Sequence, residues 1–276
     1  MKRILCLLLC VAMCLGLVAC NGEQNPPEEI IVPGLSSYEI YLKYHPEYSG
    51  SEAEWIEEVY NARKPMNPVD FSELTYVAFG DSITYGVDGI VWGQMAKPYP
   101  TLVSEQLEFK SFENKGISGS TLCSNDQGLT NMTQEILNYD GSADVISILL
   151  GVNDYKRSLP LGNANSMSNG TVYGSLFLIA EYLTSNYSNS YIFFMTPFPC
   201  RDDSNLNDAG YCLDDVCAAI KYIAGLYDIP VLDLNNVSEY ENYVNMGDGL
   251  HPSQNYFIEH GAPIIANFIK DNYPTD

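Results

Sequence analysis

"YVAFGDSITYG", residues 76–86, changes character half-way along its length. Its first four residues are apolar or aromatic and favour a packed β-strand. Gly80, Asp81 and Ser82 favour a tight turn instead. A turn of this composition can be purely structural, since every strand has to end. The alternative is that the strand ends here in order to present Ser82 at the edge of a sheet, and the rest of the sequence decides between the two interpretations.

Strands and helices alternate along the remainder of the chain. The expected strands are 74–79, 111–117, 143–150, 191–197 and 229–234, and the expected helices are 98–107, 128–137, 170–187, 213–227 and 263–272. The almost unbroken apolar run at 143–150 is typical of a strand that is buried on both faces. This order predicts an α/β fold with a doubly wound, flavodoxin-like sheet of about five parallel strands between helices.

Small and polar residues follow four segments of this predicted fold. They form the motifs "GDSIT" (80–84), "GISGST" (116–121), "GVND" (151–154) and "DGLH" (248–251). Ligands bind beyond the carboxyl ends of the strands in an open parallel sheet, so all four motifs are expected to face one crevice. Any one of them alone is a weak signal. Together, and in this order, they resemble the SGNH, or GDSL, hydrolase family over roughly residues 71–269.

The resemblance implies a role for five residues. Ser82 would be the nucleophile, His251 the general base and Asp248 the carboxylate that orients His251. The backbone N–H groups of Ser82 and Gly119 and the side-chain amide of Asn153 would form the oxyanion hole. The chemistry agrees, because a serine hydroxyl needs an adjacent base and histidine, with an unperturbed pKa of about 6.5, suits that task. Asp248 lies three residues before His251, so one turn can place its carboxylate against the imidazole. We expect Ser82 to lie in an exposed turn.

Other polar residues are weaker candidates. His260 precedes the last predicted helix and has no aspartate at the same offset, so we assign it a structural role. Asp81 and Asp154 are expected to brace their turns. Trp92 and Arg201 lie in loops that follow predicted strands, and both are candidate substrate contacts.

A segment of acidic and amide residues, "DSNLND" (203–208), partly matches a calcium-binding loop. It has Asp208 where such loops carry glycine and Asp214 where they carry glutamate. We therefore favour a polar surface loop, and we expect neither a metal nor another cofactor.

The amino terminus reads as an export signal. Lys2 and Arg3 precede an apolar run that ends in "LVAC" at Cys20. This ending resembles the lipobox of bacterial lipoproteins, which implies cleavage before Cys20 and a lipid on that cysteine. A plain secretory signal or an uncleaved anchor is the alternative. The expected protein is thus exported and membrane-anchored at the cell surface.

The predicted organisation has four parts: a lipoprotein signal peptide (1–20), a flexible tether (21–36), a small helical hairpin (37–66) and the hydrolase domain (70–276). The tether is rich in Pro, Gly and polar residues. In the hairpin, Ser51 and Glu54 form a capping-box pattern at the start of a helix. The hairpin is either a separate module or a spacer that packs on the main domain.

The chain is strongly acidic, with 35 Asp and Glu against 13 Lys and Arg and a net charge of -22. Such a surface repels phosphate backbones, so nucleic acid is not an expected partner. Contact with a membrane is expected through the lipid on Cys20 and not through charge. Four cysteines lie outside the signal: Cys123, Cys200, Cys212 and Cys217. An exported chain can pair them in three ways, and the sequence does not choose among these or indicate an oligomeric state.

These observations predict a serine esterase that hydrolyses short acyl esters, in particular acetyl esters of carbohydrates. The loops at the strand ends are rich in Asn, Ser, Gly and Asp, which suit hydroxyl groups and sugar faces better than a fatty tail. A lipase, lysophospholipase or thioesterase on the same site is an alternative. An inactive, sugar-binding surface lipoprotein is another, although the complete catalytic set favours an enzyme.

Overall fold

The computed structural model describes residues 42, 46, 48–55, 69–237 and 247–274 of the chain, which divides into two units, Met1–Lys64 and Pro65–Asp276. In the first unit a helical turn begins after Ser51. The Ser51 N–H donates to Glu54 Oε2 over 2.6 Å, and the Glu54 N–H donates to Ser51 Oγ over 3.3 Å, which is the reciprocal capping box. The predicted signal peptide, the tether and most of the predicted hairpin lie outside the described residues.

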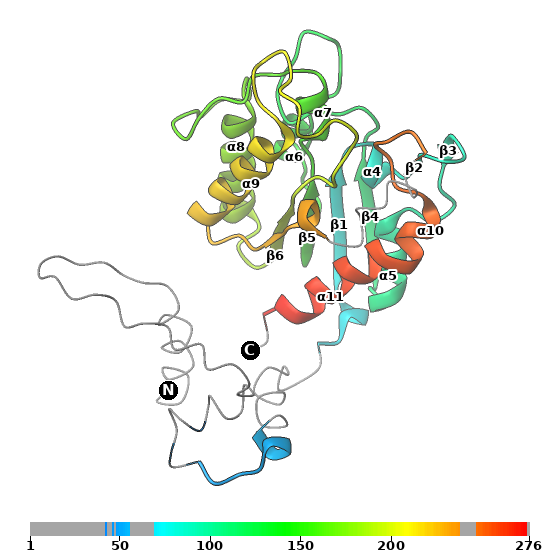
Figure 1. The fold of residues 1–276 in the computed structure, drawn as a ribbon, viewed down its shortest axis with the longest axis vertical. Helices are drawn as coiled ribbons and strands as arrows, with labels where there is room; N and C mark the ends of the chain where they lie inside the picture. Colours follow the sequence, from blue (N-terminus) through cyan, green and yellow to red (C-terminus); the bar gives the residue numbers. More distant parts are fainter. Residues whose placement is uncertain (1–41, 43–45, 47, 56–68, 238–246, 275–276) are drawn as a thin grey trace, which may run out of the picture. The chain divides into compact units, whose positions relative to one another are not determined.

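The second unit is built on a sheet of five parallel strands, and Figure 1 shows helices on both of its faces. The strands are β1 (Thr75–Gly80), β4 (Ser111–Gly116), β5 (Val145–Leu149), β6 (Tyr191–Met195) and β7 (Val231–Leu232). The main helices are α5 (Tyr99–Leu107), α6 (Met132–Leu137), α8 (Val172–Asn186), α9 (Leu213–Leu226) and α11 (Ala262–Asn272). The strand order β4-β1-β5-β6-β7 confirms the flavodoxin-like sheet that the sequence predicts.

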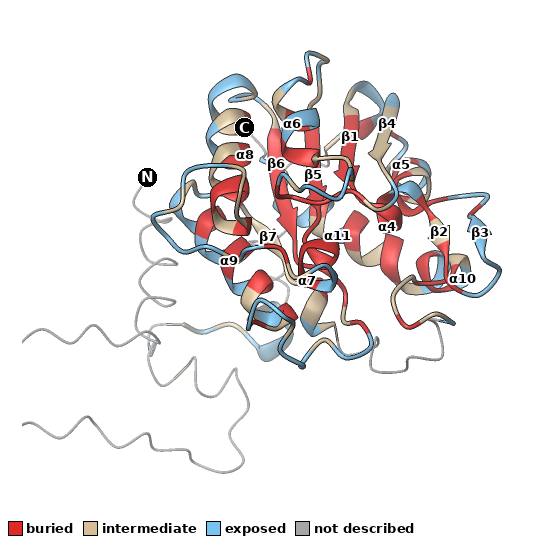
Figure 2. Cartoon of the chain, turned by 90° about the horizontal axis from the view of Figure 1, so that it is seen from above, coloured by how far each residue is buried: buried red, intermediate tan, exposed pale blue. Residues whose placement is uncertain are grey.

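Each central strand supplies side chains to two separate apolar layers. Along β1, Val77 and Phe79 pack in the layer that contains α6, α8 and α9, whereas Tyr76 and Ala78 pack in the layer that contains α5 and α11. Successive side chains of a strand point to opposite faces, so a strand covered on both sides has to be apolar throughout. Figure 2 shows the resulting band of buried residues through the sheet and the inner faces of the helices.

The strand order places the carboxyl end of β1 at a topological switch point. The chain leaves β1 for β4 on one side and later enters β5 on the other side. Connections that run in opposite directions open a crevice between them, which is where ligands bind in such sheets. Gly80 pairs with both Gly116 and Leu149. The ends of three neighbouring strands therefore stand level around the residues that follow Gly80.

Several short elements near these strand ends were not expected from the sequence. They are α4 (Ser82–Tyr85), β2 (Val87–Asp88), β3 (Gly93–Gln94), α7 (Val152–Lys156), α10 (Gln254–Tyr256) and the π-helical turn η5 (Phe257–Gly261). Each is too short for a hydrophobic period to be visible. The last helix also begins earlier than expected, because α10 and η5 run into α11, so His260 lies within a helical segment. In the part of the chain that the structure describes, no helix has the length and apolarity needed to cross a bilayer.

The helix α4 lies close against the end of β4. A Cβ atom on Gly116 would stand 2.2 Å from the backbone nitrogen of Tyr85 and 2.6 Å from the carbonyl carbon of Thr84. Both neighbours are backbone atoms, which cannot rotate away. Glycine at residue 116 is thus required for the position of the helix that begins at Ser82.

We predict that Gly116→Ala lowers the free energy of unfolding by about 2–4 kcal/mol, because the new methyl group displaces α4 from the sheet. Gly93→Ala is the matched control, since a Cβ at Gly93 in the β2–β3 hairpin would meet no atom within 4 Å. Urea denaturation measures both variants. Equal midpoints for the two variants would contradict this account of the α4 contact.

Candidate active site

The structure brings Ser82, Asp248 and His251 into one hydrogen-bonded chain. His251 Nε2 lies 2.8 Å from Ser82 Oγ, and His251 Nδ1 lies 2.6 Å from Asp248 Oδ2. Ser82 is the first residue of α4, directly beyond β1, while Asp248 and His251 belong to a turn before α10. The sequence predicted that these three residues share one crevice. In the structure they are joined by direct hydrogen bonds.

Asp248 is held so that its carboxylate faces the imidazole. Its Oδ1 accepts hydrogen bonds from the backbone N–H of Leu250 over 2.9 Å and of His251 over 2.8 Å. Burial opposes ionisation of this carboxyl, but the hydrogen bonds from the His251 ring and from the two N–H groups outweigh it and lower the pKa of Asp248. An ionised Asp248 favours a proton on Nδ1, which leaves Nε2 free to accept the Ser82 proton.

Ser82 is less accessible than the sequence suggested. We expected an exposed turn, but the residue is only 4% exposed. The His251 ring contacts the Ser82 hydroxyl. The β2–β3 hairpin packs against the segment from Asp248 to His251. A Cβ on Gly89 would stand 2.2 Å from the His251 carbonyl oxygen and 2.9 Å from Asp248 Oδ1. Ser82 is thus at the sheet edge, as expected, but it lies nearly buried beneath His251, whose turn is packed against a hairpin that the sequence did not predict.

Hydrogens that are available for donation lie at Ser82 and in the segments that follow the two neighbouring strands β4 and β5. Within residues 69–237 and 247–274, neither the Ser82 N–H nor the Gly119 N–H donates a hydrogen bond. Gly119 has φ +79°, and a Cβ there would meet no atom within 4 Å. Asn153 Nδ2 donates to the Ser120 carbonyl over 2.9 Å, which fixes the amide and leaves its second hydrogen available. Such donors can stabilise an oxyanion.

Two buried carboxylates brace the loops around these donors. Asp81 caps α4 by accepting from the Ile83 N–H over 2.9 Å. Asp154 accepts from the Leu122 and Cys123 N–H groups, each over 2.9 Å, and so fixes the loop that carries Gly119. Burial raises the pKa of Asp154, and burial together with the nearby Asp154 charge raises the pKa of Asp81 to about 7.

Trp92 and Arg201 lie on two loops that flank the Asp248–His251 turn. Trp92 stands at the tip of the β2–β3 hairpin with φ 52° and is 78% exposed. The Arg201 N–H donates to the Gly249 carbonyl over 2.7 Å. Its side chain lies against the same glycine, since a Cβ on Gly249 would stand 2.8 Å from Arg201 Nε.

The hairpin supplies two positioning residues that sequence reasoning missed. Besides Gly89, Asp88 matters because its Oδ2 accepts from the Gln254 N–H over 2.9 Å and so fixes the start of α10 behind His251. Its Oδ1 accepts from the N–H groups of Ile90 and Val91. The Asp-Gly pair at 88–89 is a turn signal in its own right and could have predicted this hairpin.

The calcium-like segment uses its polar side chains to hold its own turns. Asp203 Oδ2 accepts from the Cys200 N–H, and Asn207 Oδ1 accepts from the Ala209 and Tyr211 N–H groups. Among the residues that the structure describes, no group of three or more His, Cys, Asp or Glu is arranged to hold a metal ion. The four cysteines outside the predicted signal are free thiols in this structure.

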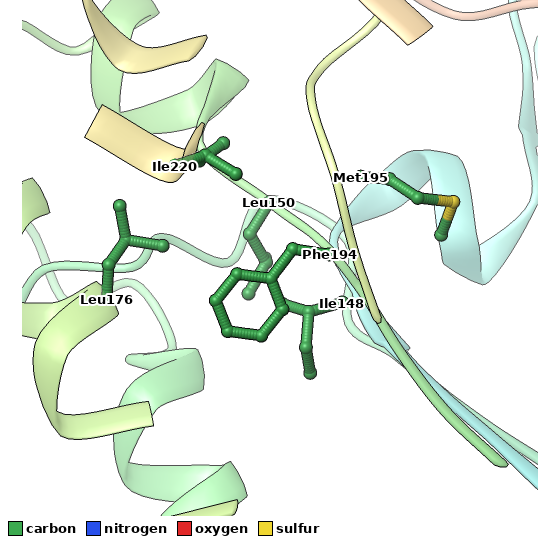
Figure 3. Close-up of a pocket in the computed structure, with 6 residues that line it drawn as sticks. All are labelled: Ile148, Leu150, Leu176, Phe194, Met195 and Ile220. Carbon is green, nitrogen blue, oxygen red and sulfur yellow. The ribbon is translucent and has the colours of Figure 1, made fainter. Parts of the chain in front are cut away.

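An apolar gap between the sheet and α8 and α9 is separate from the Ser82 site. Figure 3 shows its lining residues: Ile148, Leu150, Leu176, Phe194, Met195 and Ile220. Phe194 points toward the helices while Met195 points to the other face, as neighbours on a strand must. The gap is too small to hold a water molecule, so it is a feature of core packing.

Comparison with known proteins identifies the family. The model of the GDSL-like lipase/acylhydrolase family matches residues 78–255, from within β1 to α10. The chain belongs to this family. It is therefore a carboxylic ester hydrolase, as the four motifs predicted. No curated protein sequence matches the chain.

Solved structures support the same assignment. A possible lipase from Chitinophaga pinensis is 25% identical, with a TM-score of 0.58, and the match covers 71% of this chain and 98% of that one. A lipase/acylhydrolase from Enterococcus faecalis is 19% identical (TM-score 0.54; 74% and 99% covered). A carbohydrate acetylesterase family member from Sinorhizobium meliloti is also 19% identical (TM-score 0.51; 71% and 99% covered). The last two show a shared fold.

The raised pKa of Asp81 predicts a specific dependence of stability on pH. Its value of about 7 in the folded chain stands above the ordinary 3.8, so between these limits the folded state keeps a proton that the unfolded state loses. The contribution of Asp81 to the free energy of unfolding is therefore fully present below about pH 4 and is lost as the pH rises through about 7.

We predict that Asp81→Asn, which keeps the cap, gains roughly 1–3 kcal/mol in unfolding free energy relative to the wild type between pH 5 and pH 8. Urea denaturation at the two pH values measures this difference. Stability curves that run parallel from pH 5 to pH 8 would show that Asp81 is already ionised at pH 5.

Proposed function

We propose that the protein is a serine esterase in which Ser82 forms an acyl-enzyme. The observation that carries this proposal is the hydrogen-bonded chain from Ser82 Oγ through the His251 ring to Asp248. A serine hydroxyl becomes an effective nucleophile when a base stands within hydrogen-bond reach and a third group orients that base. Both conditions are met without any movement of the chain.

In the first half-reaction, His251 Nε2 takes the proton from Ser82 Oγ as the oxygen attacks the ester carbonyl. The carbonyl oxygen becomes an oxyanion, which the N–H groups of Ser82 and Gly119 and the Asn153 amide stabilise. His251 then gives the proton to the departing alcohol, and the acyl group stays on Ser82. Water repeats the sequence in the second half-reaction and releases the acid, while ionised Asp248 stabilises the imidazolium in both halves.

The substrates that we infer are short acyl esters, in particular acetyl groups on a saccharide. Ser82 is almost buried, which favours a small acyl group, and a Cβ on Gly119 would meet no atom within 4 Å. The loops that follow the strands are rich in small and polar residues. Trp92 offers an exposed ring on which a sugar can stack. One relative in fold is described as a carbohydrate acetylesterase family member, in agreement with this inference.

A lipase or another long-chain acylhydrolase is the second candidate. The tip of the β2–β3 hairpin favours it, because Ile90, Val91 and Trp92 are 49%, 72% and 78% exposed. An apolar tip beside the catalytic turn can contact a fatty chain as well as a sugar face. The length of the preferred acyl chain separates the two candidates.

The experiment is a series of p-nitrophenyl esters from acetyl to tetradecanoyl, with Ser82→Ala as the blank. We expect kcat/KM to peak between acetyl and butyryl and to have fallen by octanoyl. Ser82→Ala should lose at least about 10³-fold in kcat, because no other nucleophile among the described residues is hydrogen-bonded to the His251 ring. A maximum at decanoyl or beyond would promote the lipase, and Ser82→Ala activity within a few-fold of wild type would refute the nucleophile assignment.

Asn153→Ala tests the oxyanion hole. We predict a fall in kcat of about 10²–10³ with little change in KM, because the amide acts mainly on the transition state. Asn186→Ala is the matched control, since its Nδ2 also donates to a backbone carbonyl, that of Tyr182 over 2.8 Å, but on α8. If Asn153→Ala changes KM alone, the amide binds substrate instead.

We also propose that the mature chain begins at Cys20 and is held at the cell surface by a lipid on this cysteine. The support is the sequence "LVAC" after an apolar run with a positive start. Cys20→Ala should move the protein from the membrane fraction to the soluble fraction of the expressing bacterium, because a lipid chain supplies the anchoring energy. Unchanged membrane association of Cys20→Ala would rule out lipidation at this position.

A further inference from the structure

Arg201 carries a cation that no residue in the described part of the chain neutralises. The residue is exposed, and its guanidinium makes no hydrogen bond or ion pair with residues 69–237 or 247–274. Several lysines, in contrast, form ion pairs with carboxylates: Lys97 with Glu105, Lys110 with Glu73 and Lys221 with Asp233. Among the described residues the Arg201 guanidinium thus has no carboxylate partner, although the chain has a net charge of -22.

The position of this guanidinium is defined by the catalytic turn. Gly249 stands between Asp248 and His251, has φ +79°, and has no side chain. A Cβ there would lie 2.8 Å from Arg201 Nε and 2.9 Å from Arg201 Cζ, so the Arg201 side chain lies against this glycine. The Asp248 carboxylate is occupied by the His251 ring and two N–H groups, so it is not the partner of Arg201.

Lys156 fixes the Arg201 segment and adds a second positive charge. It lies three residues beyond Asn153, in the last turn of α7, and its Nζ donates to the Arg201 carbonyl over 2.5 Å. The Arg201 N–H is fixed as well, by the Gly249 carbonyl. The segment is thus held at both its N–H and its carbonyl, and the cation is presented beside the turn that carries His251.

We propose that Arg201 binds a carboxylate that the substrate carries close to its scissile ester, so that the preferred substrates are O-acylated acidic sugars of the uronic acid type. A planar guanidinium recognises a carboxylate through two parallel hydrogen bonds. Asp202 and Asp203 follow directly in the chain, and they disfavour a doubly charged phosphate more than a singly charged carboxylate. This inference rests on the esterase function proposed above.

The test compares two substrates that differ only in charge: the per-O-acetylated methyl glycosides of glucuronic acid and of glucuronamide. We expect the wild type to hydrolyse the acid with a kcat/KM at least about fivefold higher than the amide. Arg201→Gln, which keeps most of the side-chain stem, should lower kcat/KM for the acid about tenfold and leave the amide within twofold. Arg201→Lys should restore part of the preference, and 0.5 M NaCl should reduce it.

Lys110→Gln is the control for a general change of charge, because Lys110 precedes β4 at the opposite edge of the sheet. Lys110→Gln should leave kcat/KM unchanged for both substrates. Equal hydrolysis of acid and amide by the wild type would overturn the inference, as would an equal loss on both substrates in Arg201→Gln, which would show that Arg201 only supports the turn. Hydrolysis of p-nitrophenyl acetate without either sugar would refute this inference alone, whereas no hydrolysis of any ester would refute the esterase function with it.

Discussion

The hydrogen bond between His251 Nε2 and Ser82 Oγ joins two residues that are 169 positions apart in the chain. It requires the end of β1 and the turn before α10 to meet with an accuracy of a few tenths of an ångström. The sheet supplies one side of this contact, because Gly80 is fixed by pairing with β4 and β5. The other side is fixed locally, since Asp248 holds the N–H groups of its own turn as well as the imidazole.

Polar groups in the surrounding loops serve this contact at a cost in stability. Asp81 and Asp154 are both fully buried, and burial of an ionisable carboxyl is unfavourable even when its oxygens accept hydrogen bonds. What they provide is position: one begins α4 at Ser82, and the other holds the loop of Gly119. Groups that lower stability while they fix a reactive geometry are expected at functional sites.

The sequence predicted the three central strands β1, β5 and β6 well, because strands buried on both faces are continuous apolar runs. The edge strand β4 is more polar, and glycine marks its end as it marks the end of β1. It also predicted that Ser82, Asp248 and His251 share a crevice. It did not predict the near burial of Ser82 or the packing of Gly89 against the carbonyl of His251. That contact joins segments far apart in the chain, and no local pattern encodes it. The short helix α7 was missed for another reason, since five residues show no hydrophobic period.

The most direct test of the central claim is covalent labelling with a fluorophosphonate, followed by peptide mass spectrometry. The phosphonate forms a bond to an activated serine oxygen with loss of fluoride. The account predicts a single adduct, on Ser82, and a rate of labelling that falls at least about 10²-fold in His251→Ala because the base is lost. An adduct on another residue, or labelling of Ser82 that proceeds equally fast without His251, would contradict it.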